Sequence, residues 1–165
     1  MPNLIVRERS YSNLYAVEYV VGYILDPLKC FSGLYSGIGV DLYDTKAVID
    51  HFNLIKRIRK EGDTKKKVRH LVLSFDPDKE DYITPEQAFQ IAFTIAQYFG
   101  ARFQIVFGIH DEGYYRQNGN LHVHFAINTL SYIDGSRFPG ERYIFNDLIK
   151  ELRRNSDLVW DMYFT

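Results

Sequence analysis

Three of the five histidines in this chain lie close together, and two of them alternate with apolar residues. Residues 120–128 read Asn-Leu-His-Val-His-Phe-Ala-Ile-Asn, and His110 lies one predicted loop upstream. Side chains on a strand alternate between faces, so His122, His124 and Asn128 would share one face and the apolar residues the other. Two imidazoles at i and i+2, with a third from the neighbouring strand, would form a metal site with open coordination positions. Such a site acts on phosphates or activates water.

Two further polar residues have two interpretations each. Asn128 either orients a substrate or a water beside the metal, or simply ends its strand. Ser74 lies on the polar face of a predicted strand, where it either holds a substrate phosphate or is an ordinary hydroxyl near a strand end. A serine nucleophile is disfavoured, because no nucleophile-elbow glycine pattern surrounds Ser74.

A row of tyrosines offers a different nucleophile. Tyr11, Tyr15, Tyr19 and Tyr23 follow one another at a spacing of four, near one face of a predicted helix. A tyrosine has an ordinary pKa of about 10, so attack on phosphorus needs activation, which a nearby divalent cation can supply. Such a row is more often part of a core, and we expect at least three of the four to be buried.

The basic residues are unevenly distributed. The chain carries a net charge of -1, but residues 56–69 hold eight basic and two acidic side chains, a local charge of +6. A charge run of this kind is usually a solvated loop. It can also be an arm that follows phosphates, because phosphate contacts supply most sequence-independent DNA affinity. On that interpretation the DNA contacts are Lys65, Lys66, Lys67 and Arg69, together with Asn128.

Length and composition predict one globular domain over residues 1–165, with a core of ordinary size. The lone cysteine, Cys30, excludes an internal disulfide framework and a cysteine-based metal motif. The sequence has neither a signal-peptide pattern nor an apolar run long enough to span a membrane. We therefore expect a cytoplasmic protein without membrane insertion.

The periodicity predicts helix, helix, strand, helix, strand, strand, helix. The elements are expected at 10–25, 46–59, 70–75, 85–100, 102–109, 121–128 and 146–154, with a loop at 31–39. Thr45 would cap the second helix. Thr84-Pro85-Glu86-Gln87 is a capping-box start, and Gly100 would end that helix as a left-handed cap. The last two strands would form a hairpin, which brings His110 beside His122 and His124.

These elements predict an α+β fold with a central antiparallel sheet. Helices would pack on one face of the sheet and leave the other partly open.

Three ordered motifs carry a family resemblance. They are Tyr-Ile-Leu-Asp-Pro-Leu-Lys at 23–29, His-Leu-Val-Leu-Ser-Phe-Asp-Pro-Asp at 70–78, and His110 followed by 121–128. Together they resemble the relaxase and mobilisation nuclease family of the HUH endonucleases, over nearly the whole chain. The resemblance implies the relaxase form of this fold, with a ferredoxin-like or RRM-like palm.

The resemblance also implies a function. Relaxases nick one DNA strand at a plasmid or conjugative-element transfer origin and form a 5′-phosphotyrosine link. Their nucleophile corresponds here to Tyr23, and their metal ligands correspond to His110, His122 and His124. The motif serine corresponds to Ser74, which would contact DNA near the scissile phosphate. The implied cofactor is a divalent ion, Mg²⁺ or Mn²⁺, and the implied partners are single-stranded DNA and relaxosome accessory or coupling proteins.

The early position of the tyrosine favours relaxases over replication initiators, which carry it after the histidines. Where the family usually has aspartate two residues after its first histidine, this chain has Glu112. The loop up to His122 also looks longer than usual, and its Tyr114-Tyr115 pair suits either a plain insertion or a lid that stacks on bases. Three alternatives stay open: a single-stranded DNA-binding module that does not nick, a histidine-metal phosphoesterase, and Tyr19 in place of Tyr23 as the nucleophile.

Overall fold

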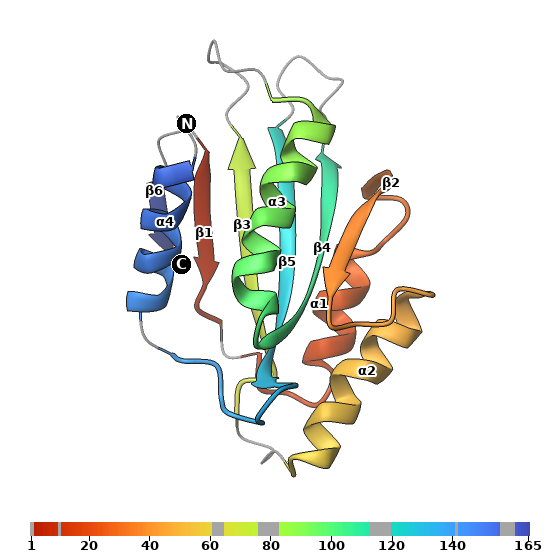
Figure 1. Ribbon diagram of the computed structural model, residues 1–165. Coiled ribbons are helices and arrows are strands. Elements are labelled where there is room, and N and C mark those ends of the chain that lie inside the picture. Colours follow the sequence, from red (N-terminus) through yellow and green to blue (C-terminus); the bar gives the residue numbers. More distant parts are fainter. Residues whose placement is uncertain are drawn as a thin grey trace.

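The computed structural model describes residues 2–9, 11–60, 65–75, 83–112, 120–140, 142–155 and 161–165. Within these ranges, six strands form one sheet and four helices pack on it (Figure 1). The chain order is β1 (Asn3–Arg7), α1 (Ala16–Ile24), β2 (Cys30–Ile38), α2 (Thr45–Ile58), β3 (Val68–Phe75), α3 (Pro85–Gly100), β4 (Phe103–Glu112), β5 (Asn120–Ser131), α4 (Tyr143–Asn155) and β6 (Asp161–Phe164).

The sheet is mostly antiparallel, in the order β2-β4-β5-β3-β1-β6. The predicted β4–β5 hairpin is confirmed, and its register pairs His110 directly with His122. Only one of these pairings, between β1 and β6 at one edge, is parallel. The predicted α+β class with an antiparallel central sheet is therefore confirmed.

One face of the sheet carries the larger core. Leu71, Leu73 and Phe75 of β3 point to this face, as the alternation predicted, and they join apolar residues of α3 and α4. α3 begins as predicted: the Thr84 hydroxyl accepts from the backbone of Gln87, whose side chain accepts from the backbone of Thr84. This capping box and Pro85 fix where α3 starts against the sheet.

The second face of the sheet also carries helices, whereas we predicted helices on one face only. Val68, Val106 and Ala126 point to this side and form a second core with α1 and α2. The two helices cover only part of the face. The apolar face of α1, whose valines pack against this side of the sheet, was overlooked in the sequence.

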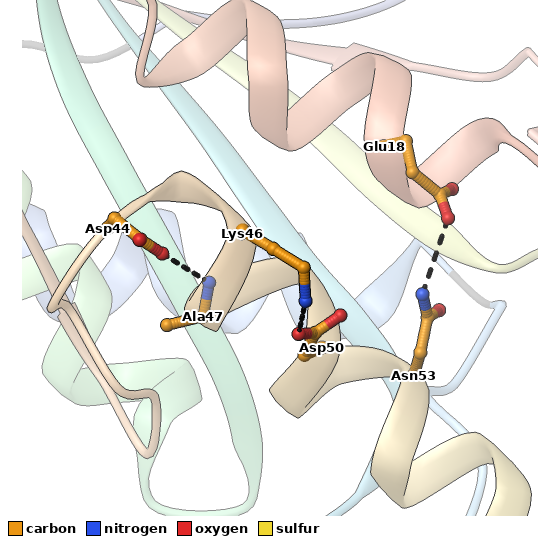
Figure 2. A network of polar contacts seen from close by, with 6 residues as sticks. All are labelled: Glu18, Asp44, Lys46, Ala47, Asp50 and Asn53. Atoms are coloured by element: carbon orange, nitrogen blue, oxygen red, sulfur yellow. Dashed lines mark hydrogen bonds and ion pairs between the residues drawn. The ribbon is translucent and has the colours of Figure 1, made fainter.

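Several boundaries also differ from the prediction. A loop was expected at 31–39, but residues 30–38 form the edge strand β2, which pairs with β4 across an irregular register. Neither β1 nor β6 was predicted. Asp44 rather than Thr45 caps α2, because its carboxylate accepts from the backbone N–H of Ala47 at 2.7 Å (Figure 2).

Gly100 is a close-contact residue rather than the predicted left-handed cap. It is the last residue of α3, and Ala101 follows it in right-handed helical geometry. A Cβ built at Gly100 would lie 2.7 Å from a methyl of Ile38. The glycine therefore lets β2 approach α3. Among the described residues, no helix is long and apolar enough to cross a membrane.

Candidate active site

The histidines stand in adjacent rows on the sheet face that carries α1. Cross-strand pairing aligns Ser74 of β3, His122 of β5 and His110 of β4 in one row. His124 lies in the next row, opposite Gly108. The ring centroids of His110 and His124 are 4.4 Å apart, and those of His122 and His124 are 6.3 Å apart. The three histidines that the sequence grouped, and Ser74, are thus brought together.

Helix α1 ends directly above these rings and delivers Tyr23 to them. The Tyr23 ring centroid lies 5.1 Å from the ring centroids of both His110 and His124. The helix stops here because Asp26-Pro27 follows it, and the residue before a proline is disfavoured in the α region. Tyr23 is partly buried, whereas Tyr19, the alternative nucleophile one turn back, is 66% exposed.

Two contacts hold the end of α1 at this height over the sheet. Nε2 of His110 lies 2.9 Å from the carbonyl oxygen of Ile24, to which it donates. Gly108 lets the same carbonyl approach the strand, because a Cβ built there would lie 2.6 Å from the Ile24 oxygen and 3.1 Å from Sγ of Cys30. The position of Tyr23 therefore depends on a glycine in the neighbouring row.

The Gly108→Ala substitution should move Tyr23 away from the histidines. Because the added methyl group meets backbone rather than a flexible side-chain end, we expect a loss of about 1–3 kcal/mol in the free energy of unfolding. Any phosphoryl-transfer activity that depends on Tyr23 should fall at least about tenfold. Urea unfolding and a cleavage assay on the same preparation measure both effects.

Gly22→Ala is the matched control for Gly108→Ala. It adds the same methyl group one residue from Tyr23, where no atom other than those of its chain neighbours and its own helix backbone lies within 4 Å, and it raises the helix propensity of α1. Unchanged activity in Gly108→Ala would contradict the assignment of Gly108 as a spacer for α1.

A fourth histidine, His70, completes the cluster. Its Nε2 lies 3.0 Å from Nδ1 of His124, and its Nδ1 lies 3.1 Å from the hydroxyl of Tyr11. Tyr11 is buried and has a positive φ of 40°, a conformation that a residue other than glycine rarely adopts. Sequence reasoning missed the role of His70, although His70 lies on the same strand face as Ser74.

The hydrogen bonds of this chain limit which ring nitrogen of His124 can bind a metal ion. If Nδ1–H of His124 donates to His70, and Nδ1–H of His70 donates to Tyr11, then Nε2 of His124 keeps a lone pair. A metal-ligating histidine typically donates its other N–H to such an acceptor, which fixes the tautomer. His70 and Tyr11 are therefore placed to orient His124.

Burial keeps these imidazoles neutral. It is the main cause that lowers the pKa of His124 to about 2, with the neighbouring His110 contributing. Burial likewise lowers the pKa of His70 to about 4, and Arg7 adds to the effect. Neutral imidazoles retain the lone pairs that metal binding requires.

The same shifts predict an acid-sensitive fold. Both pKa values lie below the unfolded value of about 6.5, so below that pH the unfolded chain binds protons that the folded chain does not. The free energy of unfolding should therefore fall as the pH falls from 6.5 towards 4, by about 1.4 kcal/mol per pH unit for each histidine. Urea unfolding in EDTA at pH 7 and pH 5 measures the slope. His70→Gln should make it shallower, and a slope equal to wild type would contradict the shift at His70.

A pocket of about 440 Å³ opens over Tyr23, His70 and His124. We call it the catalytic pocket, and its wall includes Arg7 and Arg9 at the end of β1. Guanidinium groups pair with phosphate oxygens through several donors, so these two arginines suit a polyanionic substrate. They were missed because β1 itself was not predicted.

The histidines of the cluster have the right chemistry to bind a divalent ion, but their side chains are not arranged as a coordination sphere in this structure. His110, His122 and His124 are imidazoles on one sheet face, which suits a metal with open positions. Among the described residues, however, no three His, Cys, Asp or Glu side chains are arranged to hold a metal ion.

The family comparison agrees with this geometry. A family model described as "Relaxase: MobA/VirD2-like, nuclease domain" matches residues 23–158, which is most of the chain. The chain belongs to the relaxase family. No curated protein and no solved structure matches it.

The relaxase domain places Asn128 away from the histidine cluster. Its side chain is fully buried beneath α2, where its Oδ1 accepts from Nζ of Lys56 at 2.7 Å. Its amide nitrogen donates to Gln104 at 2.8 Å and to the backbone of Phe52. A side chain enclosed in this way cannot reach DNA, so the sequence-based role of Asn128 as a DNA contact is corrected to a structural one.

The predicted basic arm does not form one surface. Lys65 is exposed, whereas Lys67 is 9% exposed and lies between α1 and α2. Lys66 donates to the backbone oxygen of Glu8 at 3.5 Å. Arg69 pairs with Ile127 on the α3 and α4 side of the sheet, where it lies over the Phe138 ring. Alternation along β3 thus separates Arg69 from His70. The predicted lid at Tyr114-Tyr115 lies outside the described residues.

Proposed function

We propose that this relaxase domain is a metal-dependent DNA endonuclease and transesterase that nicks one strand through Tyr23. The observation that carries the proposal is the position of Tyr23. Its ring centroid lies 5.1 Å from the ring centroids of both His110 and His124, and its side chain lines a pocket whose wall includes Arg7 and Arg9. The family match supports the nuclease class. A plasmid or conjugative-element transfer origin as the target, and relaxosome accessory or coupling proteins as partners, are part of the same proposal.

The proposed reaction is a phosphoryl transfer without net hydrolysis. Oη of Tyr23 forms a bond to the scissile phosphorus, and the bond from phosphorus to the 3′ oxygen breaks. The phenolic proton of Tyr23 passes to water in the pocket, and the departing 3′ oxygen takes up a proton from water to become a 3′-hydroxyl. The 5′ phosphate stays on Tyr23, so the phosphodiester energy is retained and the strand can be resealed.

The phenoxide that forms at Tyr23 needs a nearby positive charge. Nζ of Lys29 lies 4.7 Å from the centroid of the Tyr23 ring. An ammonium group there stabilises the developing phenoxide and attracts the incoming phosphate. His124 is poorly suited to accept the phenolic proton, because a base with a pKa of about 2 holds almost none at neutral pH.

His110, His122 and His124 would hold a divalent ion, and Mn²⁺ suits imidazole nitrogen better than Mg²⁺, which prefers oxygen ligands. Such an ion, when bound, would polarise a scissile phosphate and stabilise its developing charge. In the same proposal Ser74, beside His122, contacts DNA near the scissile phosphate. Arg7 and Arg9 hold neighbouring phosphates.

The direct test is a search for a covalent protein–DNA adduct. The protein is incubated with labelled single strands that tile the transfer region of its own element, in Mn²⁺ or Mg²⁺, and resolved on a denaturing gel. The proposal expects an adduct that needs both the metal and a single strand. DNA binding without an adduct under any metal would favour the non-nicking module, and release of small phosphate without an adduct would favour a phosphoesterase.

A further inference from the structure

The outer face of α1 carries two exposed aromatic rings that no core absorbs. Tyr15 is 70% exposed and Tyr19 is 66% exposed, contrary to the expectation that at least three of the four tyrosines at positions 11, 15, 19 and 23 are buried. The backbone N–H of Tyr19 donates to the backbone carbonyl oxygen of Tyr15 at 2.9 Å, so the two residues lie one helical turn apart. With Tyr23 they form a row in which each step rises about 6 Å. We call Tyr15, Tyr19 and Tyr23 the tyrosine row.

The tyrosine row joins two hollows. Tyr19 and Tyr23 line the catalytic pocket. Tyr15 lines a second hollow between α1 and α2, together with Asn53, Arg57 and Lys60. We call this second hollow the α1–α2 groove. A ligand long enough to occupy both hollows would pass over the Tyr19 ring.

The charges in both hollows favour a polyanion. Arg57 and Lys60 are exposed at the end of α2, and the largely buried Lys56 and Lys67 also line the α1–α2 groove. Glu18 is the acidic residue in the wall of this groove, and its carboxylate accepts from Asn53 at 3.4 Å across the two helices (Figure 2). At the other end, Arg7 and Arg9 line the catalytic pocket.

We propose that one arm of the single-stranded DNA substrate runs from Tyr23 along α1, stacks bases on Tyr19 and Tyr15, and places phosphates against Arg57 and Lys60. The inference rests on the proposed function, because it starts the path at the scissile phosphate. Aromatic rings between cations suit a single strand, because its unpaired bases can stack on the rings while the phosphates that join its nucleotides contact the cations. A duplex could not use the rings, because its bases stack on one another.

Fluorescence anisotropy with labelled oligo(dT), in the Tyr23→Phe background and without metal, isolates binding from covalent capture. The double variant Tyr15→Ala/Tyr19→Ala should bind at least about tenfold more weakly, because two stacking contacts are lost. Tyr15→Phe/Tyr19→Phe should bind as the background does, because the rings remain. Arg57→Ala and Lys60→Ala should each reduce the slope of log affinity against log salt by about 0.7.

Tyr143→Ala and Lys150→Ala on α4, on the opposite side of the sheet, are the matched controls. Both residues are exposed, and neither change should alter binding. Thermal unfolding verifies that every variant is folded. Equal affinity of Tyr15→Ala/Tyr19→Ala and Tyr143→Ala would overturn the DNA path alone, even if wild type forms its adduct. Failure of wild type to bind any single strand would overturn the proposed function together with the path.

Discussion

Tyr23→Phe should abolish the covalent protein–DNA adduct while leaving single-strand affinity within about twofold of wild type. The substitution removes one oxygen and keeps the ring that packs 5.1 Å from His110 and His124. No bond to phosphorus can form without that oxygen, so the loss is complete rather than graded. The measurement pairs a denaturing gel for the adduct with anisotropy for binding.

Tyr19→Phe is the matched control for Tyr23→Phe. It removes the same oxygen one helical turn away, from a ring that also lines the catalytic pocket. We expect its adduct yield to equal that of wild type. An adduct that survives in Tyr23→Phe and disappears in Tyr19→Phe would transfer the nucleophile to Tyr19.

His124→Ala should lower Mn²⁺ affinity by at least about tenfold and adduct formation by at least about a hundredfold. His124 lies at the centre of the cluster, between the rings of His110 and His70, and its hydrogen bond to His70 is lost with it. Isothermal titration with Mn²⁺ reads metal binding independently of cleavage. The cleavage assay then shows whether both properties fall together.

His51→Ala is the control, because His51 is the one histidine outside this cluster and lies on α2. It should bind Mn²⁺ as wild type does. Since His124 is buried, unfolding by urea must show that the His124→Ala variant is still folded. A folded His124→Ala that keeps full Mn²⁺ affinity and cleavage would contradict the metal assignment.

The sequence predicted those parts of the relaxase domain that depend on local signals. The capping box at Thr84 and the alternation in β3 and β5 are properties of a few adjacent residues, and the structure contains them. The β4–β5 hairpin followed from alternation on both sides of one loop. These elements suffice to bring His110 beside His122.

Elements whose stability comes from distant partners escaped prediction. β1 has only five residues, and its pairing with β3 joins segments far apart in the chain. β2 contains four glycine and serine residues, which normally indicate a loop, yet Gly37 is needed because a Cβ there would lie 2.6 Å from the backbone oxygen of Ile105. Strand preference of this kind depends on context rather than on the residues themselves.

The sequence also did not predict which side of α1 packs against the sheet. A spacing of four places tyrosines on one side of α1 but does not say whether the sheet or solvent covers that side. The structure buries Val17, Val20 and Val21 of α1 instead and exposes Tyr15 and Tyr19. The residue types alone could not distinguish these two orientations.

The most direct test of Tyr23 as the nucleophile is mass spectrometry of the adduct after nuclease and protease digestion. All four tyrosines of the early segment fall between Arg9 and Lys29, so one tryptic peptide carries them and fragmentation locates the modified ring. We predict a nucleotide 5′ phosphate on Tyr23 and on no other tyrosine. A phosphate remnant on Tyr19, or metal-dependent cleavage that leaves no remnant on this peptide, would contradict the assignment.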